Sequence, residues 1–275
     1  AVWGGMIVVL AFYLRRYIGR VGALFAALFL AISPGMVYFS RYYIHEMFFV
    51  FLALALVVAM AFFVEQRKPG TGAIAWMVVL LLVCFFPSTL NLSSAIAKDN
   101  ETLFWVISIA VFLVEAALVF LIIRMLLGWN DGRSIYLLLA AASVSLMFAT
   151  KETAFITLGT MLISCLCIWA WPKIYSAAKE TNGEFHSQDL GWANFQGAIG
   201  TGSDRILLLV GAAAVFIYLG VLFFSSFFTY PEGVKKAFEA YAIWTKTGST
   251  DHTQNGTWAF LKWGMEIEAP IMILS

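Results

Sequence analysis

Charged side chains are scarce in this sequence of 275 residues. Asp, Glu, Lys and Arg together make up 12% of it, whereas hydrophobic residues make up 62%, and the mean hydropathy is +0.87. Soluble domains have about a quarter charged residues and about half apolar ones. The scarcity of charge excludes an ordinary soluble domain. It predicts an all-α fold, a polytopic bundle of transmembrane helices.

Net charge and cysteine are also low. The formal net charge of +1 argues against nucleic acid as a partner, because nucleic acid requires a basic face. The three cysteines, Cys84, Cys165 and Cys167, lie in apolar runs, and the spacing of the last two fits neither a zinc nor a redox pair. We therefore expect these cysteines to form neither a disulfide framework nor a metal cluster. The sequence also has no glycine-rich phosphate loop and no nucleophile elbow.

Long apolar runs dominate what is present. A helix needs about twenty apolar residues to cross a bilayer, and the first and sixth runs are shorter than this. A ninth run begins near Glu268, and both ends of the sequence lie in apolar stretches. We interpret residues 1–275 as one transmembrane domain, an internal piece of a longer protein. The eight predicted spans are Ala1–Leu14, Val21–Phe39, Met47–Val64, Ala73–Leu92, Leu103–Leu127, Ile135–Ala149, Ala154–Trp171 and Ile206–Phe228.

Basic residues are unevenly distributed between alternate loops. If the first run ends in the cytoplasm, ten Lys and Arg residues lie in the inside loops and three in the short outside loops. Four more lysines lie in the long segment 229–262. The positive-inside rule counts short loops, so it selects this orientation. Residues 41–46, 150–152 and 229–265 then share the outer face.

Two longer loops complete this topology. Residues 172–205 form a Gly-, Asn- and Ser-rich stretch, which we interpret as a flexible cytoplasmic connector. Residues 229–265 form an extracytoplasmic loop, and their amphipathic part, 234–244, predicts an interfacial helix on the bilayer.

A compact polar cluster lies between the second and third runs. Arg41, His45 and Glu46 follow the helix-breaking pair Pro34-Gly35, and four aromatic residues lie between positions 38 and 43. Ionisable groups at the edge of hydrocarbon are costly and usually pair with each other or with a substrate. Glu46 is a candidate general base or metal ligand, or else an acid favoured at a helix N-terminus. Arg41 suits a phosphate, or else pairs with Glu46.

A second charged pair, Lys151-Glu152, separates two apolar runs with almost no loop. These charges must stay near the membrane surface, where a lysine can receive an anionic lipid headgroup. The alternatives are a local Lys151–Glu152 pair or simple snorkelling. Farther along, His252 beside Asp251 is a candidate metal ligand or substrate contact, although a lone loop histidine is more often neither.

These motifs resemble the GT-C class of membrane glycosyltransferases, which includes the protein O-mannosyltransferases and the lipid A aminoarabinose transferase. Residues 33–46 are similar to the segment that follows the third helix of that class, and residues 148–153 are similar to another of its segments. The stretch 252–270 resembles the flippase-activity-associated branch of prokaryotic proteins. The resemblance covers three short stretches and the hydropathy pattern.

The resemblance implies a hexosyltransferase in the plasma (inner) membrane of a prokaryote, with its active face extracytoplasmic. Its donor is a polyprenyl-phosphate-linked sugar, and its acceptor is a protein or a glycan, as in protein glycosylation. Glu46 matches the second acidic position, a catalytic candidate, whereas the principal catalytic acid of the class precedes Ala1. By this resemblance, the parts of the family's fold that residues 1–275 lack are the first helix, the first outer loop and the C-terminal part. A divalent cation stays open as a cofactor. The substrate-binding candidates are Arg41, His45, Lys151, Glu152 and His252.

A rival interpretation is the translocation of a lipid-linked sugar, or a transporter subunit. Transporters tend to place charges at mid-membrane, on broken helices, and often have repeated halves. Here Glu115 and Arg124 are the notable charges inside runs; Arg124 lies near a span end, and Glu115 has no evident partner. No repeat is evident. A purely structural subunit would leave the outer cluster unexplained.

Overall fold

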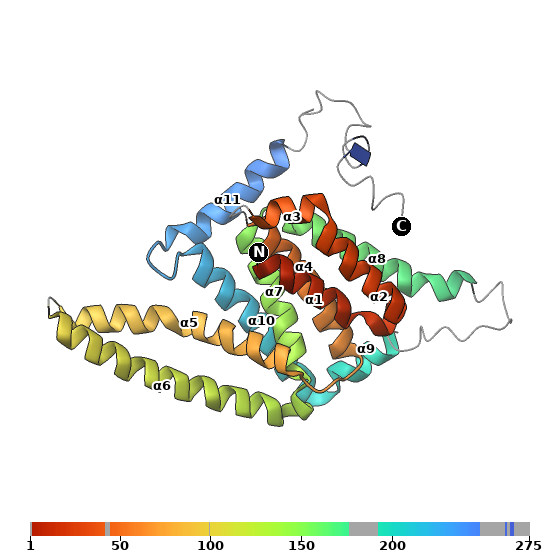
Figure 1. The fold of residues 1–275 in the computed structure, drawn as a ribbon. Helices are drawn as coiled ribbons and strands as arrows, with labels where there is room; N and C mark the ends of the chain where they lie inside the picture. The colour runs from red at the N-terminus through yellow and green to blue at the C-terminus, as the bar shows by residue number, and fades with distance from the viewer. Residues whose placement is uncertain are drawn as a thin grey trace. The chain divides into compact units, whose positions relative to one another are not determined.

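All regular secondary structure in the described part of the chain is helical (Figure 1). The computed structural model describes residues 2–41, 45–98, 100–175 and 192–247, together with Lys262, Met265 and Glu266. This confirms the all-α class. The helices are α1 Val2–Tyr13, α2 Arg15–Ile32, α3 Pro34–Arg41, α4 Glu46–Val64, α5 Thr71–Ala97, α6 Glu101–Gly128, a 3-10 turn Trp129–Gly132, α7 Ser134–Thr150, α8 Ala154–Tyr175, α9 Trp192–Ile199, α10 Gly202–Phe224 and α11 Glu232–Thr247.

Four of these helices, α4, α5, α6 and α10, are long and apolar enough to cross a membrane by length and composition. The number is five if the bent α2–α3 pair forms one span. Helices α1, α7 and the first part of α8 are apolar but shorter. Each of the eight predicted runs contains a helix, but the number of spans stays a prediction. The predicted ninth run lies outside the described residues.

The predicted span Val21–Phe39 is two helices rather than one. Helix α2 ends at Ile32, and α3 continues from Pro34 at an angle bent by 54°. Proline lacks the N–H that a continuous helix would need, and it drives the residue before it out of the helical region. Ser33 accordingly has φ −55° and ψ 121°, and its hydroxyl accepts the Met36 N–H at 3.1 Å, which caps α3.

The chain divides into two compact units. The first contains residues 1–58, 143–168 and 231–275, and the second contains residues 59–142 and 169–230. In the first unit, the Trp3 ring lies 4.5 Å from that of Phe48 and 5.0 Å from that of Phe51, which packs α1 on α4. A Cβ on Gly4 would lie 3.2 Å from the Ser40 Cβ, so a small residue permits the close approach of α1 and α3.

The second unit contains a helical hairpin, α5–α6, and a short helix within the predicted cytoplasmic connector. Asn100 caps α6, since its side-chain oxygen accepts the Leu103 N–H at 3.0 Å. Helix α9 lies inside the connector predicted at 172–205, as do the last residues of α8 and the first of α10. Residues 176–191 are outside the described part.

Candidate functional site

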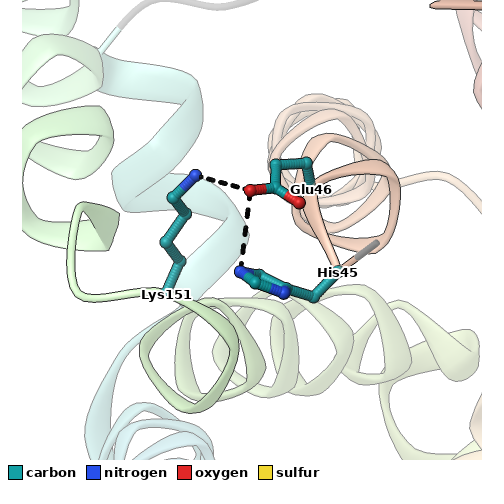
Figure 2. Close-up of polar contacts among 3 residues, drawn as sticks. All are labelled: His45, Glu46 and Lys151. Carbon is teal, nitrogen blue, oxygen red and sulfur yellow. Dashed lines mark hydrogen bonds and ion pairs between the residues drawn. The ribbon is translucent and has the colours of Figure 1, made fainter. Parts of the chain in front are cut away.

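The two charged motifs of the sequence meet in the first unit. The Lys151 ammonium donates to Oε1 of Glu46 at 3.1 Å, across 105 residues of chain (Figure 2). His45 Nε2 lies 3.7 Å from the same oxygen. The Glu46 and Lys151 side chains are 35% and 32% exposed. One carboxylate oxygen is therefore shared by two nitrogen groups that solvent can reach.

Glu46 is held at this place because it is the first residue of an apolar helix. The next turn of α4 is anchored in the core, with Met47 4% and Phe51 2% exposed. An acidic side chain at a helix N-terminus also lies in the favourable field of the helix dipole. The start of α4 by itself therefore favours a carboxylate at position 46. Its pairing with Lys151 is a separate feature of the tertiary structure.

Lys151 is held by the tight turn that joins α7 to α8. Its N–H donates to the Met147 carbonyl at 3.0 Å, which ends α7, and its carbonyl accepts the Ala154 N–H at 3.1 Å, which begins α8. Thr150 donates to the Leu146 carbonyl at 2.6 Å. Because both ends of the turn are tied to helices, the Lys151 backbone has a fixed place from which the flexible side chain reaches Glu46.

The sequence left two local ion pairs open, Arg41 with Glu46 and Lys151 with Glu152, and the described residues form neither. Lys151 pairs with Glu46 rather than with its neighbour Glu152, which is exposed. Arg41 is the last residue of α3, is exposed, and forms no ion pair with Glu46 within the described residues. The structure therefore brings together three of the sequence-predicted residues, His45, Glu46 and Lys151.

The two remaining expectations are the role of His252 and the divalent cation. His252 lies outside the described residues. Among residues 2–41, 45–98, 100–175 and 192–247, no group of three or more His, Cys, Asp or Glu side chains gathers in the way that a metal ion requires. The proposed divalent cation thus has no ready protein cage there.

Sequence reasoning missed two contacts, one made by Tyr241 close to Lys151 and one made by Thr89 with Glu115. Tyr241 of α11 donates to the Phe148 carbonyl at 3.3 Å, three residues before Lys151. Thr89 of α5 donates to Glu115 of α6, so the expectation that Glu115 has no partner is wrong. The amphipathic pattern of residues 234–244 predicts the helix that carries Tyr241 but not its contact with Phe148. The contact of Thr89 has no signal in the sequence either, because a threonine in an apolar run is inconspicuous.

Comparison with known proteins gives no relative. No family model matches the chain, and no curated protein or solved structure matches it either. The likeness to the GT-C class therefore rests on the hydropathy pattern and on the short motifs at residues 33–46, 148–153 and 252–270. The family stays a prediction.

Proposed function

We propose that this chain belongs to a membrane glycosyltransferase of the GT-C kind, which moves a sugar from a polyprenyl-phosphate carrier to an extracytoplasmic acceptor. The observation that carries the proposal is the ion pair between Glu46 and Lys151, with His45 beside it. A lipid-linked donor presents its phosphate at the level of the headgroups. A lysine and a carboxylate at the ends of apolar helices are the groups that such a reaction needs at that depth.

The chemistry divides between the two charges. The acceptor hydroxyl or amine attacks the anomeric carbon of the sugar, the bond from that carbon to the phosphate oxygen breaks, and polyprenyl phosphate leaves with the electron pair. The Lys151 ammonium offsets the charge on the departing phosphate. The Glu46 carboxylate orients the acceptor or assists the base that takes its proton.

The ion pair between Glu46 and Lys151 is weak, and this supports a role in which a substrate replaces one of its partners. An ion pair between side chains that are about one-third exposed contributes about 1 kcal/mol or less to stability. A substrate phosphate therefore competes easily for Lys151, and this releases Glu46 toward the acceptor. A pair that existed for stability alone gains little from this geometry.

The rival function is translocation of the lipid-linked sugar without transfer. Glu115 favours it, because this carboxylate is 6% exposed and lies midway along a membrane-length helix, where transporters place charges. The helix break at Ser33 is a second transporter-like feature. Pro34 accounts for the helix break, and Thr89 bonds Oε2 of Glu115. The Oε1 atom of Glu115 is buried without a hydrogen-bond partner, so Glu115 is the feature that keeps the rival function in play.

One assay separates the two functions. The full-length protein in liposomes receives a labelled polyprenyl-phosphate sugar on its outer face, with peptide and glycan acceptors. We expect label to become covalently attached to an acceptor. Movement of label between leaflets without attachment would establish translocation instead. Protein carrying Glu46→Gln is the control for adventitious transfer.

A further inference from the structure

Tyr241 of α11 contacts both helices that flank the turn of Lys151. Its hydroxyl donates to the Phe148 carbonyl of α7 at 3.3 Å, and its ring meets that of Phe148 edge-on at 5.9 Å. On the other side of the turn, the same ring meets Phe155 of α8 edge-on at 6.4 Å. A single half-buried side chain from the outer segment therefore spans the turn.

The hydrogen bond falls on a group that helix ends leave exposed. Phe148 lies in the last turn of α7, where carbonyls are beyond the regular helical ladder and require other donors. A hydroxyl from another segment caps this end, and the edge-on aromatic pairs with Phe148 and Phe155 stabilise the contact beyond burial. Burial, together with the nearby Glu152 charge, raises the Tyr241 pKa, so the hydroxyl keeps its proton and stays a donor at neutral pH.

We infer that Tyr241 is a positioning residue that holds the turn at residues 151–153 and thereby keeps the Lys151 ammonium on Glu46. The Lys151 backbone is tied to Met147 and Ala154, so the place of its side chain follows the ends of α7 and α8. Tyr241 fixes those two ends relative to each other. The outer helix α11 is thereby coupled to the ion pair, and the kinetic meaning of this coupling rests on the proposed function.

The inference has a structural test that does not depend on activity. A water-soluble carbodiimide activates the Glu46 carboxylate, and the Lys151 amine then displaces the urea to form an amide, which peptide mass spectrometry detects. In the full-length protein in membranes we expect this cross-link, with a yield several-fold lower in Tyr241→Phe and lower still in Tyr241→Ala. Phe238→Ala is the matched control, because Phe238 lies on the same helix and is 74% exposed. Its yield should equal that of the wild type.

Two outcomes overturn the inference. One is an unchanged cross-link yield in both Tyr241 variants. The other is an equal loss in Phe238→Ala, which would mean that any change in α11 has the same effect and that Tyr241 has no particular role.

A kinetic test links the position to the reaction. If Tyr241 acts through Lys151, Tyr241→Phe should raise the donor concentration needed for half-maximal rate, and it should add nothing in a Lys151→Gln background. A rise of the same size in the Lys151→Gln background would overturn the inference, because Tyr241 would then affect donor binding independently of Lys151, and a fall in maximal rate alone would overturn it too, because that reflects only less active protein. Absence of all transfer by the wild-type protein would defeat the proposed function, while the cross-link would still judge the role of Tyr241.

Discussion

Glu46 and Glu115 are carboxylates on membrane-length helices, and their surroundings differ in depth and in partner. Glu46 is the first residue of α4, is 35% exposed, and faces the ammonium of Lys151 and the imidazole of His45. Glu115 lies midway along the 28 residues of α6, is 6% exposed, and accepts a hydrogen bond from the neutral hydroxyl of Thr89. The Glu46 side chain is partly exposed, although its Oε2 atom is buried, whereas the Glu115 side chain is almost fully buried.

The partner decides what each carboxylate can do. An exposed ion pair is weakly held, so a phosphate or an acceptor can replace either partner. The Glu115 carboxyl has one oxygen, Oε2, bonded by the Thr89 hydroxyl, while Oε1 is buried without a hydrogen-bond partner; loss of Thr89 would leave the whole group unpaired in hydrocarbon. Glu46 is thus suited to chemistry, and Glu115 is suited to joining α5 to α6.

The first prediction concerns orientation and is all-or-none. In a cysteine-free background, Thr102→Cys should react with an impermeant thiol reagent from outside intact cells, and Gly70→Cys should not. The two positions flank α5 and are exposed, and a Cβ on Gly70 meets nothing within 4 Å. The basis is the excess of basic residues in one set of short loops. Labelling of the Gly70 variant from outside would move Glu46 to the cytoplasmic face and remove the comparison.

The second prediction sets the two carboxylates against each other by the same substitution. In the full-length protein, Glu46→Gln should lower the rate of sugar transfer by about tenfold or more, because the charge is lost while size and most hydrogen bonding remain. Glu115→Gln should stay within about twofold of the wild-type rate, since the amide oxygen still accepts from Thr89. The measurement is the initial rate at saturating donor, with folding checked by gel filtration.

A reversed pattern would contradict this assignment. If Glu115→Gln abolished the activity of the protein while Glu46→Gln spared it, the mid-membrane carboxyl would be the functional one. Translocation would then become the better interpretation.

The third prediction tests the cation of the exposed pair. Lys151→Gln should raise the donor concentration needed for half-maximal rate by about tenfold, and it should lower the maximal rate less, because a ground-state charge contact is lost. Lys235→Gln is the control, since this lysine of α11 is 83% exposed. An unchanged donor dependence would leave Lys151 as a snorkelling residue that stabilises Glu46.

Hydropathy and proline chemistry predict much of the fold. Each apolar run contains a helix, and Pro34 marks the place of the 54° bend. The lengths are predicted less well: α5 continues to Ala97, beyond the run that ends at Leu92, and includes the polar residues Ser93, which is buried, and Ser94, which bonds back to the Asn91 carbonyl. Polar residues end an apolar run without ending a helix, so hydropathy places such ends too early.

The candidate site is predictable in its parts and not in its pairing. The cost of charge near hydrocarbon singles out Glu46 and Lys151 separately, but nothing in the sequence states that residues 105 apart meet. The local alternatives that the sequence left open, Arg41 for Glu46 and Glu152 for Lys151, join residues that are close in sequence. Tertiary packing overrides this proximity. Tyr241 shows the same limit, because an amphipathic pattern predicts a helix and says nothing of which carbonyl its tyrosine caps.

The last prediction has the smallest effect and concerns the buried partner. Thr89→Val keeps the shape of the side chain and removes the hydroxyl that Glu115 accepts from. Hydrogen bonds between membrane helices contribute about 0.6 kcal/mol on average and less than about 2 kcal/mol at most. We therefore expect the free energy of unfolding in mild detergent to fall by about 1 kcal/mol, with the rate of sugar transfer unchanged.

The matched control is Thr160→Val, because the Thr160 hydroxyl donates to Ile156 of its own helix and joins no second helix. Its stability should change by a few tenths of a kcal/mol at most. Loss of transfer in Thr89→Val at unchanged stability would mean that Glu115 serves the reaction rather than the hairpin, and the two carboxylates would no longer differ in kind.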